Sequence, residues 1–446
     1  MSYPFRPANN QPFTFDALIG HMRSVFKNLL DARTGNNTHY TMVDAALGGF
    51  SVFFTQSPSF LEFQRNMELA KGRSNASTLF KMTEIPSDNH IRNLLDPVPP
   101  EELFPLFAHI IDGLYDLDYL ESYRSINGTL LVPMDGTQYF YSTKICCKNC
   151  TVKNPNKGKT NYSHTVVTPV IAAPGSHSVF PLEPEFITPQ DGHDKQDCEN
   201  AAAKRWLAKF GPRYRDWRIS ILGDDLYCKQ PVCEAILGEG MSFILVCKPD
   251  SHKTLYEWVA GLETIGGVET LSVTRRHGKQ LETDTYRFVN RVPLRDGKDA
   301  LEVNWCEVTT RNASGEVIYK NAFATNHKIT KDNVAEIVLA GRTRWKVENE
   351  NNNTLKTKGY HLTHNFGHGK QNLSAVMATL NLLAFLTHTV LGLMDANYQL
   401  VRQKLVTRKN FFNDLRALTR YLCFDSWTAL LLFMMRGLEI VPPDTS

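Results

Sequence analysis

The sequence has little net charge, no internal repeat and no long low-complexity segment. Its 446 residues include 49 lysines and arginines against 46 aspartates and glutamates, which gives a formal net charge of +3. A surface that binds nucleic acid must therefore come from local clusters of basic residues and not from bulk charge. The N-terminal stretch MSYPFRPANN has no basic head followed by an apolar run, so we expect no secretory signal.

Disulfide patterning is also absent. The nine cysteines are scattered and odd in number, which favours free thiols in a reducing cytosol. The stretch QNLSAVMATLNLLAFLTHTVLGLM, residues 371–394, contains no charged residue and is long enough to cross a membrane. It also carries several polar side chains, which cost less inside a protein than in lipid. We therefore expect a buried core helix in a soluble protein, with a membrane span as the alternative.

The chain is long enough for two or three domains, and the spacing of its apolar residues changes along its length. Residues 1–125 have apolar residues at helical spacing, which fits a helical bundle or a DNA-binding module. Residues 126–370 contain alternating and continuous apolar strands. Residues 371–446 are again helical as far as about residue 437.

The strand-rich part has a recognisable order. GTLLVPMD, TQYFYSTKI and SHTVVTPVIAA indicate three consecutive strands of one sheet, followed by a helix with Asp194 as its expected N-cap. WRISILGDDLY indicates a fourth strand, KQPVCEAILGEG a helix and MSFILVCK a fifth strand. This order predicts an α/β fold with a ribonuclease-H-like mixed sheet. A β-rich insertion is expected at about residues 255–328, with hairpin turns at Asp296-Gly297 and Ser314-Gly315.

Two of these strands end on acids. Asp135 follows LLVPM, and the pair Asp224-Asp225 follows RISILG. The two strands are expected to lie side by side, so their acids meet at one edge of the sheet, and Glu348 comes from a later helix. Asp-Gly at 135–136 is also a common hairpin turn, which is the plainer interpretation. Carboxylates that meet repel one another unless divalent cations neutralise them.

The motifs MDGTQYF, LGDDLY and RWKVENENNNTLK resemble those of a DDE transposase from a bacterial insertion sequence, in the cut-and-paste group with a β-rich insertion before the final acid. The segment GYHLTHNFGHGKQNLS is similar to one branch of that family, and the resemblance covers about residues 85–400. It implies Asp135, Asp224 and Glu348 as catalytic residues and metal ligands for two Mg²⁺ or Mn²⁺ ions. It also implies a homodimer on paired DNA ends, binding to terminal inverted repeats and target DNA, and a bacterial, nucleoid-associated location in the cytoplasm.

Spacing within these motifs guides the choice of residues. The family has an aromatic residue three positions after the second acid, and Tyr227 favours Asp224 over Asp225. It has Arg four positions before the final Glu, which Arg344 and Glu348 match. Two departures leave Glu350 as an alternative to Glu348: Gly341 stands where Tyr is frequent, and Lys356 comes eight residues after Glu348 and not seven. Arg344 and Lys356 are candidate DNA contacts, or part of a solvated helix face.

A basic, cysteine-containing stretch follows the second strand. TKICCKNCTVKNPNKGKTNYSH offers Lys148 and Lys153 for DNA phosphates, although a solvated loop is the plainer interpretation. Cys147 and Cys150 have the spacing of half a zinc site, which His164 or His177 could complete. The second Cys pair of a complete motif is missing, so reduced thiols are the alternative. Two other functions remain open: a related metal-dependent nuclease without strand transfer, and an inactive DNA-binding remnant.

Overall fold

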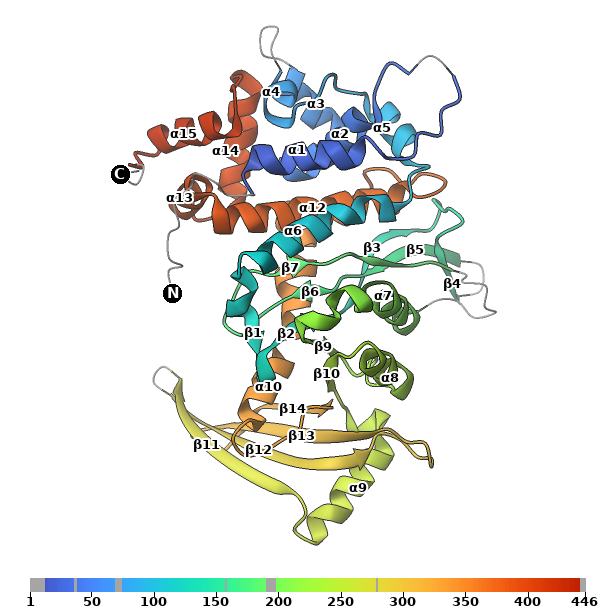
Figure 1. Cartoon of the computed structure of the whole chain (residues 1–446), viewed down its shortest axis with the longest axis vertical. Helices are drawn as coiled ribbons and strands as arrows, with labels where there is room; N and C mark the ends of the chain where they lie inside the picture. Colours follow the sequence, from blue (N-terminus) through green and yellow to red (C-terminus); the bar gives the residue numbers. More distant parts are fainter. Residues whose placement is uncertain are drawn as a thin grey trace.

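The protein is a mixed α/β molecule, seen in a computed structural model that describes residues 13–35, 38–68, 74–156, 159–189, 198–277 and 280–441. Figure 1 shows three parts along its long axis: helices from both ends of the chain, a central sheet, and a curved antiparallel sheet at the far end. The α/β class expected from the sequence is therefore confirmed. The division into three domains stays a prediction, because the first and last helical regions share one hydrophobic core.

The N-terminal region is helical, as expected. Thr14, Thr41 and Ser87 cap helices by accepting backbone N–H groups, as Ser and Thr do at helix starts. The buried Asn75 side chain donates to the carbonyls of Thr419 and Leu422, which ties this region to the C-terminal helices. The helices are α1 (Phe15–Phe26), α2 (Met42–Phe54), α3 (Phe60–Glu68), α4 (Asn75–Phe80), α5 (Asp88–Leu95) and α6 (Phe104–Asp116), with short 3-10 turns at Pro100–Leu103, Tyr119–Tyr123 and Ile126–Gly128.

Three parallel strands form the centre of the main sheet. β2 (Thr129–Pro133) pairs with β9 (Ile219–Gly223), and β9 pairs with β10 (Ser242–Val246). All are continuous apolar runs, as strands covered on both faces are. The prediction that the first and fourth strands lie side by side is confirmed. The short β1 (Arg124–Ser125) flanks β2 on its other side.

The chain of β2 continues past Asp135 into β3 (Gly136–Ser142), and β5 (Lys159–Val167) continues into β6 (Val170–Ile171). The pairs Gly136↔Val167 and Leu131↔Ala172 keep one antiparallel register across the gap. A third strand in two pieces, β7 (Phe180–Pro181) and β8 (Glu185–Ile187), pairs with β6 and β5. The expectation of two separate strands in GTLLVPMD and TQYFYSTKI is wrong, because β2 and β3 are two pieces of one strand interrupted at Asp135. SHTVVTPVIAA (β5 and β6) is therefore the second strand, and the β7–β8 strand, which was not expected, is the third. Counted in this way, the spatial order is third, second, first, fourth and fifth strand. The stretch between the second and third expected strands is not only a loop, because β4 (Thr151–Asn156) pairs with β5.

Helices α7 (Glu199–Tyr214) and α8 (Gln230–Gly238) connect the third, fourth and fifth strands. The position of Asp194, the expected cap of α7, lies outside the described residues, and Cys198 occupies the N-cap position. β10 then continues the sheet into an antiparallel insertion of four strands: β14 (Val317–Thr325), β13 (Glu302–Asn312), β12 (Gln280–Pro293) and β11 (Glu269–His277). Both expected hairpin turns lie between these strands.

The expected start of the insertion at residue 255 is wrong in one respect. Residues 253–264 form a helix, α9 (Lys253–Thr264), and the strands begin at Glu269. Leu255 and Val259 are buried and stand four residues apart, which is the spacing of one helix face. The Gly266-Gly267 pair follows the helix and separates it from β11.

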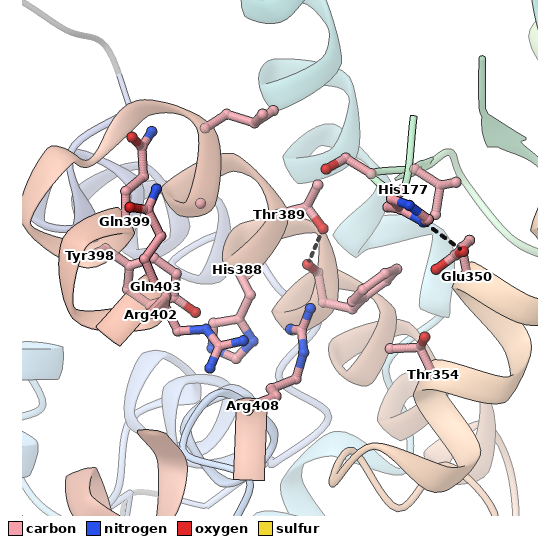
Figure 2. A pocket seen from close by; sticks show the side chains of 15 residues that line it. His177, Glu350, Thr354, His388, Thr389, Tyr398, Gln399, Arg402, Gln403 and Arg408 are labelled. Carbon is pink, nitrogen blue, oxygen red and sulfur yellow. Dashed lines mark hydrogen bonds and ion pairs between the residues drawn. The ribbon is translucent and has the colours of Figure 1, made fainter. Parts of the chain in front are cut away.

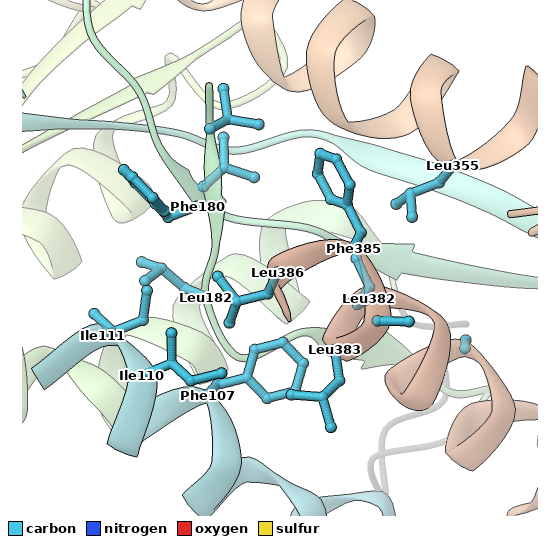
Figure 3. Packing of buried hydrophobic residues seen from close by; sticks show 14 of the residues in the cluster. Phe107, Ile110, Ile111, Phe180, Leu182, Leu355, Leu382, Leu383, Phe385 and Leu386 are labelled. Atoms are coloured by element: carbon cyan, nitrogen blue, oxygen red, sulfur yellow. The ribbon is translucent and has the colours of Figure 1, made fainter. Parts of the chain in front are cut away.

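The C-terminal part consists of α10 (Val334–Arg342), a π-helix (Val347–Asn352), α11 (Asn353–Thr357), α12 (Leu373–Met394), α13 (Ala396–Lys404), α14 (Arg408–Tyr421) and α15 (Trp427–Gly437). Among the described helices, only α12 is long and apolar enough to cross a membrane, and most of it is buried inside the protein. Figure 3 shows its leucines packed between α6 and the strand at Phe180. The expected buried core helix is confirmed.

Candidate carboxylate site and cysteine–histidine cluster

Asp135 and Asp224 lie at the same edge of the central sheet. Pro133 and Leu222 are paired in the β2–β9 register, and each acid follows its paired residue by two positions. The Met134 N–H donates to the Leu222 carbonyl at 2.9 Å, so the pairing extends to the residue before Asp135. The sheet therefore brings together the two acids that the strand ends predicted.

The neighbouring aspartates of GDDLY have different environments. Asp224 Oδ1 accepts the Leu226 N–H at 2.9 Å, a local turn contact. Asp225 Oδ1 accepts the Lys248 N–H at 2.7 Å and lies 3.4 Å from His252 Nε2. Asp225 therefore fastens the fourth strand to the segment after β10, whereas Asp224 acts electrostatically on Asp135.

Glu348 lies in the π-helix, four residues after Arg344, with which it forms an ion pair. The same short helix carries Asn352, whose Nδ2 donates to Asp135 Oδ2 at 3.2 Å. Thr168, which stands opposite Asp135 in the strand pair, donates to Asn352 Oδ1 at 2.9 Å. The π-helix is thus fixed against the end of β2, and π-turns are frequent at functional sites.

A fourth carboxylate, Glu199, was not anticipated. It begins α7, and a Cβ placed on Gly136 would come within 2.3 Å of its carboxyl carbon. Tyr227 is buried and its hydroxyl donates to Glu199 Oε2 at 3.4 Å. The aromatic residue of the second motif therefore contacts a further acid, and the glycine after Asp135 leaves room for that acid.

Burial and neighbouring acids raise the pKa of Asp135 to about 7. Loss of hydration is the largest cause, followed by repulsion from Glu348 and Glu199, while Arg344 opposes the rise and Asp224 adds to it. Burial and Asp224 also raise the pKa of Glu199. The pKa of Asp135 is raised because burial and the neighbouring acids, taken together, outweigh the opposing charge of Arg344.

Carboxylate oxygens are the donors that a hard divalent cation prefers. Mg²⁺ and Mn²⁺ take carboxylate oxygens and keep several waters, and a cation would remove the repulsion that raises the pKa of Asp135. The carboxylates are not gathered as tightly as a loaded site: among the described residues, the only groups with all ligand atoms within 4.8 Å of one another consist of cysteines and histidines. The Glu348 carboxylate is paired with Arg344 instead.

This titration gives a testable pH dependence. The unfolded aspartate titrates near 3.8 and the folded one near 7, so the folded protein binds the proton more tightly. Ionisation of Asp135 therefore lowers the stability of the magnesium-free protein as pH rises through that window, by up to about 1.4 kcal/mol per pH unit. We expect Asp135→Asn to remove this contribution to the fall of the unfolding free energy with rising pH, as measured by calorimetry between pH 4 and 8. Parallel stability curves for the two proteins would contradict it.

The basic residues named from the sequence lie in different places. Lys356 is close to Asp135. Burial lowers the pKa of Lys356, and the charge of Asp135 opposes this lowering. Lys153 is exposed and acts on Glu199 electrostatically, and Lys148 is exposed in the turn before β4. Arg344 is half-buried on Glu348. Glu350, the alternative to Glu348, points elsewhere, to His177 Nδ1 at 3.4 Å.

Glu350 lines a pocket of about 440 Å³ between the π-helix and helices α12–α14 (Figure 2). The opposite wall carries Arg402 and Arg408, and within the described part of the chain neither is paired with a carboxylate. His388 is buried between them with its Nε2 unpartnered. Such a wall suits an anionic group such as a phosphate.

Two groups of cysteines and histidines could hold a metal ion such as zinc. The first contains Cys147 and Cys150, as the sequence predicted, together with His164 and the unanticipated His368. His177 does not take part. The second group is Cys228, Cys247 and His252, all buried. All nine cysteines are free, so the expectation of thiols without disulfides is confirmed.

No protein-family model and no curated protein matches this chain. Functional conclusions therefore rest on the residues and their geometry. Two features carry them: the acids at one sheet edge and the cysteine–histidine group.

Proposed function

We propose that the chain is a DDE-type DNA transposase with a ribonuclease-H-like catalytic sheet. Support comes from the spatial strand order and from the strand directions: the second strand (β5) runs antiparallel to its neighbours on both sides, and the first, fourth and fifth strands (β2, β9 and β10) run parallel. The single observation that carries the proposal is the meeting of Asp135 and Asp224 at one edge of that sheet, with Glu348 near enough to raise the pKa of Asp135.

In this proposal Asp135, Asp224 and Glu348 would hold Mg²⁺ or Mn²⁺ ions. Two such ions, when bound, activate the attacking oxygen and stabilise the leaving one. Asp135 must lose its proton to serve as a ligand. Glu348 must break its ion pair with Arg344 before its carboxylate can bind a metal ion. Lys356, beside Asp135, and the released Arg344 then face the phosphate with positive charge.

The reaction has two steps. A water molecule attacks a phosphodiester at the transposon end, the P–O3′ bond breaks, and the 3′ oxygen leaves as a hydroxyl. That hydroxyl attacks a phosphodiester of target DNA, which forms a new P–O bond and releases a second 3′ hydroxyl. Both steps exchange one phosphodiester oxygen for another and need no redox partner. The exposed Lys148 and Lys153, together with the Arg402–Arg408 pocket, are proposed to hold DNA phosphates, and a homodimer is proposed to pair the two ends.

The test uses DNA duplexes taken from the borders of the gene, with Mg²⁺ and a supercoiled target plasmid. The proposal requires 3′ hydroxyl ends at the border and joined products in the plasmid. Cleavage without joining would favour a nuclease, and binding without cleavage an inactive remnant. A version with Glu348→Gln is the matched negative control, because it keeps the side-chain shape and removes the charge.

DNA binding should respond to the exposed lysines beside the site. Replacing Lys148 and Lys153 with Gln should weaken binding of all sequences, and the slope of log affinity against log salt should fall by up to about 2, since each phosphate contact releases about one counterion. Filter-binding assays across a salt series measure this. Lys27→Gln with Lys298→Gln, also exposed, is the control pair. An unchanged slope in the first pair would exclude phosphate contacts there.

A further inference from the structure

The first cysteine–histidine group brings together three distant parts of the chain. Cys147 and Cys150 lie in the turn between β3 and β4, His164 lies on β5, and His368 lies in the segment between α11 and α12. Cys150, His164 and His368 are 1%, 4% and 7% exposed. Four side chains with the donor atoms of a structural zinc site therefore lie together, three of them buried and Cys147 partly buried, and none of the cysteines forms a disulfide.

The separations between the donor atoms match the edges of a tetrahedron around zinc. The two sulfurs are 3.9 Å apart, and the Nε2 atoms of His164 and His368 are 3.1 Å apart. His164 Nε2 lies 3.5 Å from Cys147 Sγ and 3.4 Å from Cys150 Sγ, and His368 Nε2 lies 3.4 Å from Cys150 Sγ. Zinc with its usual bond lengths gives edges of about 3.8 Å for S–S, about 3.6 Å for S–N and about 3.4 Å for N–N.

Simpler explanations fit less well. A disulfide needs sulfurs about 2 Å apart, far closer than those of Cys147 and Cys150. Hydrogen bonds between thiols and imidazoles would use one proton for each contact, yet all four donor atoms lie within 4.8 Å of one another, so each has more than one close neighbour in the group. The contact between His164 Nε2 and His368 Nε2 at 3.1 Å needs either a proton on one nitrogen or a cation between two lone pairs. Two thiolates and one Zn²⁺ form a neutral unit, which suits burial.

A second contact sets the orientation of His368. Its Nδ1 lies 3.2 Å from the Gly369 carbonyl, so Nδ1–H is the donor and Nε2 is left with a lone pair directed at the cluster. The Cys147 N–H points at Cys150 Sγ at 3.4 Å, which stabilises a thiolate there. We propose that Cys147, Cys150, His164 and His368 bind one structural Zn²⁺ ion in a closed tetrahedral site.

The ion would fasten the segment before α12 onto the sheet. Asn149 already donates to the Gln371 carbonyl at 2.7 Å, and Asp96 accepts the N–H groups of Lys370, Gln371 and Leu373. Zinc therefore joins the turn that carries Lys148, the strand that runs to Thr168 opposite Asp135, and the start of the central helix α12. This role goes beyond the proposed function and does not depend on it.

Metal analysis of the purified full-length chain tests the site. We expect about one zinc per chain, and Co²⁺ exchanged for it should give the visible absorption and the sulfur-to-metal charge-transfer band of a tetrahedral thiolate site. Binding to the metal-free chain should release protons, because thiols must ionise to act as ligands. A chain purified without zinc that also fails to bind Co²⁺ with this spectrum would overturn the proposal.

Variants separate this site from the second group. His368→Ala and Cys147→Ser should each lower the zinc content and change the Co²⁺ spectrum, and Cys146→Ser, an exposed neighbour, should leave both unchanged. Cys228→Ser should also keep the metal. Zinc lost with Cys228→Ser and kept with His368→Ala would place the ion in the second group and refute the assignment. If a variant fails to fold, His368→Cys separates the two groups: it keeps a ligand atom and adds a thiolate, so the charge-transfer band of Co²⁺ should grow only if the ion lies in the first group, and an unchanged band would refute the assignment.

Discussion

Asp224→Asn is expected to abolish DNA cleavage, and Asp225→Asn is expected to keep it. Asparagine has the shape of aspartate without its charge, so a metal ligand loses its hold on the cation while the fold remains. Asp224 acts electrostatically on Asp135 and Glu199, whereas Asp225 is engaged with the Lys248 N–H and His252. We expect a loss of at least about 100-fold in cleavage for Asp224→Asn, in line with removal of a group that stabilises transition-state charge.

The measurement is single-turnover cleavage of a border duplex in Mg²⁺, with a gel-shift assay on the same DNA. Binding should persist in both variants, because it rests mainly on basic contacts. A lower melting temperature is expected for Asp225→Asn, since Asn is a weaker partner for the contacts of Asp225. Full cleavage by Asp224→Asn together with loss in Asp225→Asn would show that the neighbouring acid is the ligand.

Leu386→Ala is expected to lower the free energy of unfolding by about 2–5 kcal/mol, the range for truncating a buried leucine. Leu386 is fully buried in α12, in the cluster with Phe107 and Phe180 shown in Figure 3. Urea unfolding of the detergent-free protein measures the change. The matched control is Leu339→Ala on α10, where the side chain is 52% exposed and the expected effect is below about 0.5 kcal/mol.

Equal, small effects of the two leucine substitutions would mean that α12 is not part of a packed core. Such a result would favour the alternative interpretation, in which residues 371–394 span a membrane. Recovery of folded protein only in detergent would point the same way. The polar side chains of α12 argue against it: Asn381 donates to the Tyr360 carbonyl at 2.8 Å, and the Tyr360 hydroxyl meets His388 Nδ1 at 2.6 Å.

Local patterns in the sequence were sufficient for much of the sheet and its acids. Apolar runs between turn residues predict strands, and the order of three strands, helix, strand, helix and strand is that of a ribonuclease-H-like sheet, which is why the strands before Asp135 and Asp224 were expected side by side. The choice of Asp224 rested on the spacing to Tyr227, and the contacts of Asp225 with other segments agree with it. Hairpin turns are similarly local, so both turns of the insertion were found.

The missed residues depend on contacts between distant segments. His368 follows His164 by about 200 residues, and no spacing rule links a histidine in a glycine-rich loop to a Cys-x-x-Cys turn. Glu199 begins a helix, where an acid ordinarily serves the helix dipole, so its approach to Gly136 could not be anticipated. The one available signal was the glycine after Asp135, which leaves space for a neighbour. Helix α9 was missed because its apolar face is short.

The central claim is that Asp135, Asp224 and Glu348 form one divalent metal site. Anomalous diffraction from crystals of the protein with border DNA and Mn²⁺ tests it most directly. The account predicts manganese peaks within about 2.2 Å of carboxylate oxygens of Asp135 and Asp224, with Glu348 released from Arg344 to complete the site. Carboxylate carbons of any two of the three acids more than about 12 Å apart in the DNA-bound state would contradict it, since two ions about 4 Å apart cannot be shared over that span.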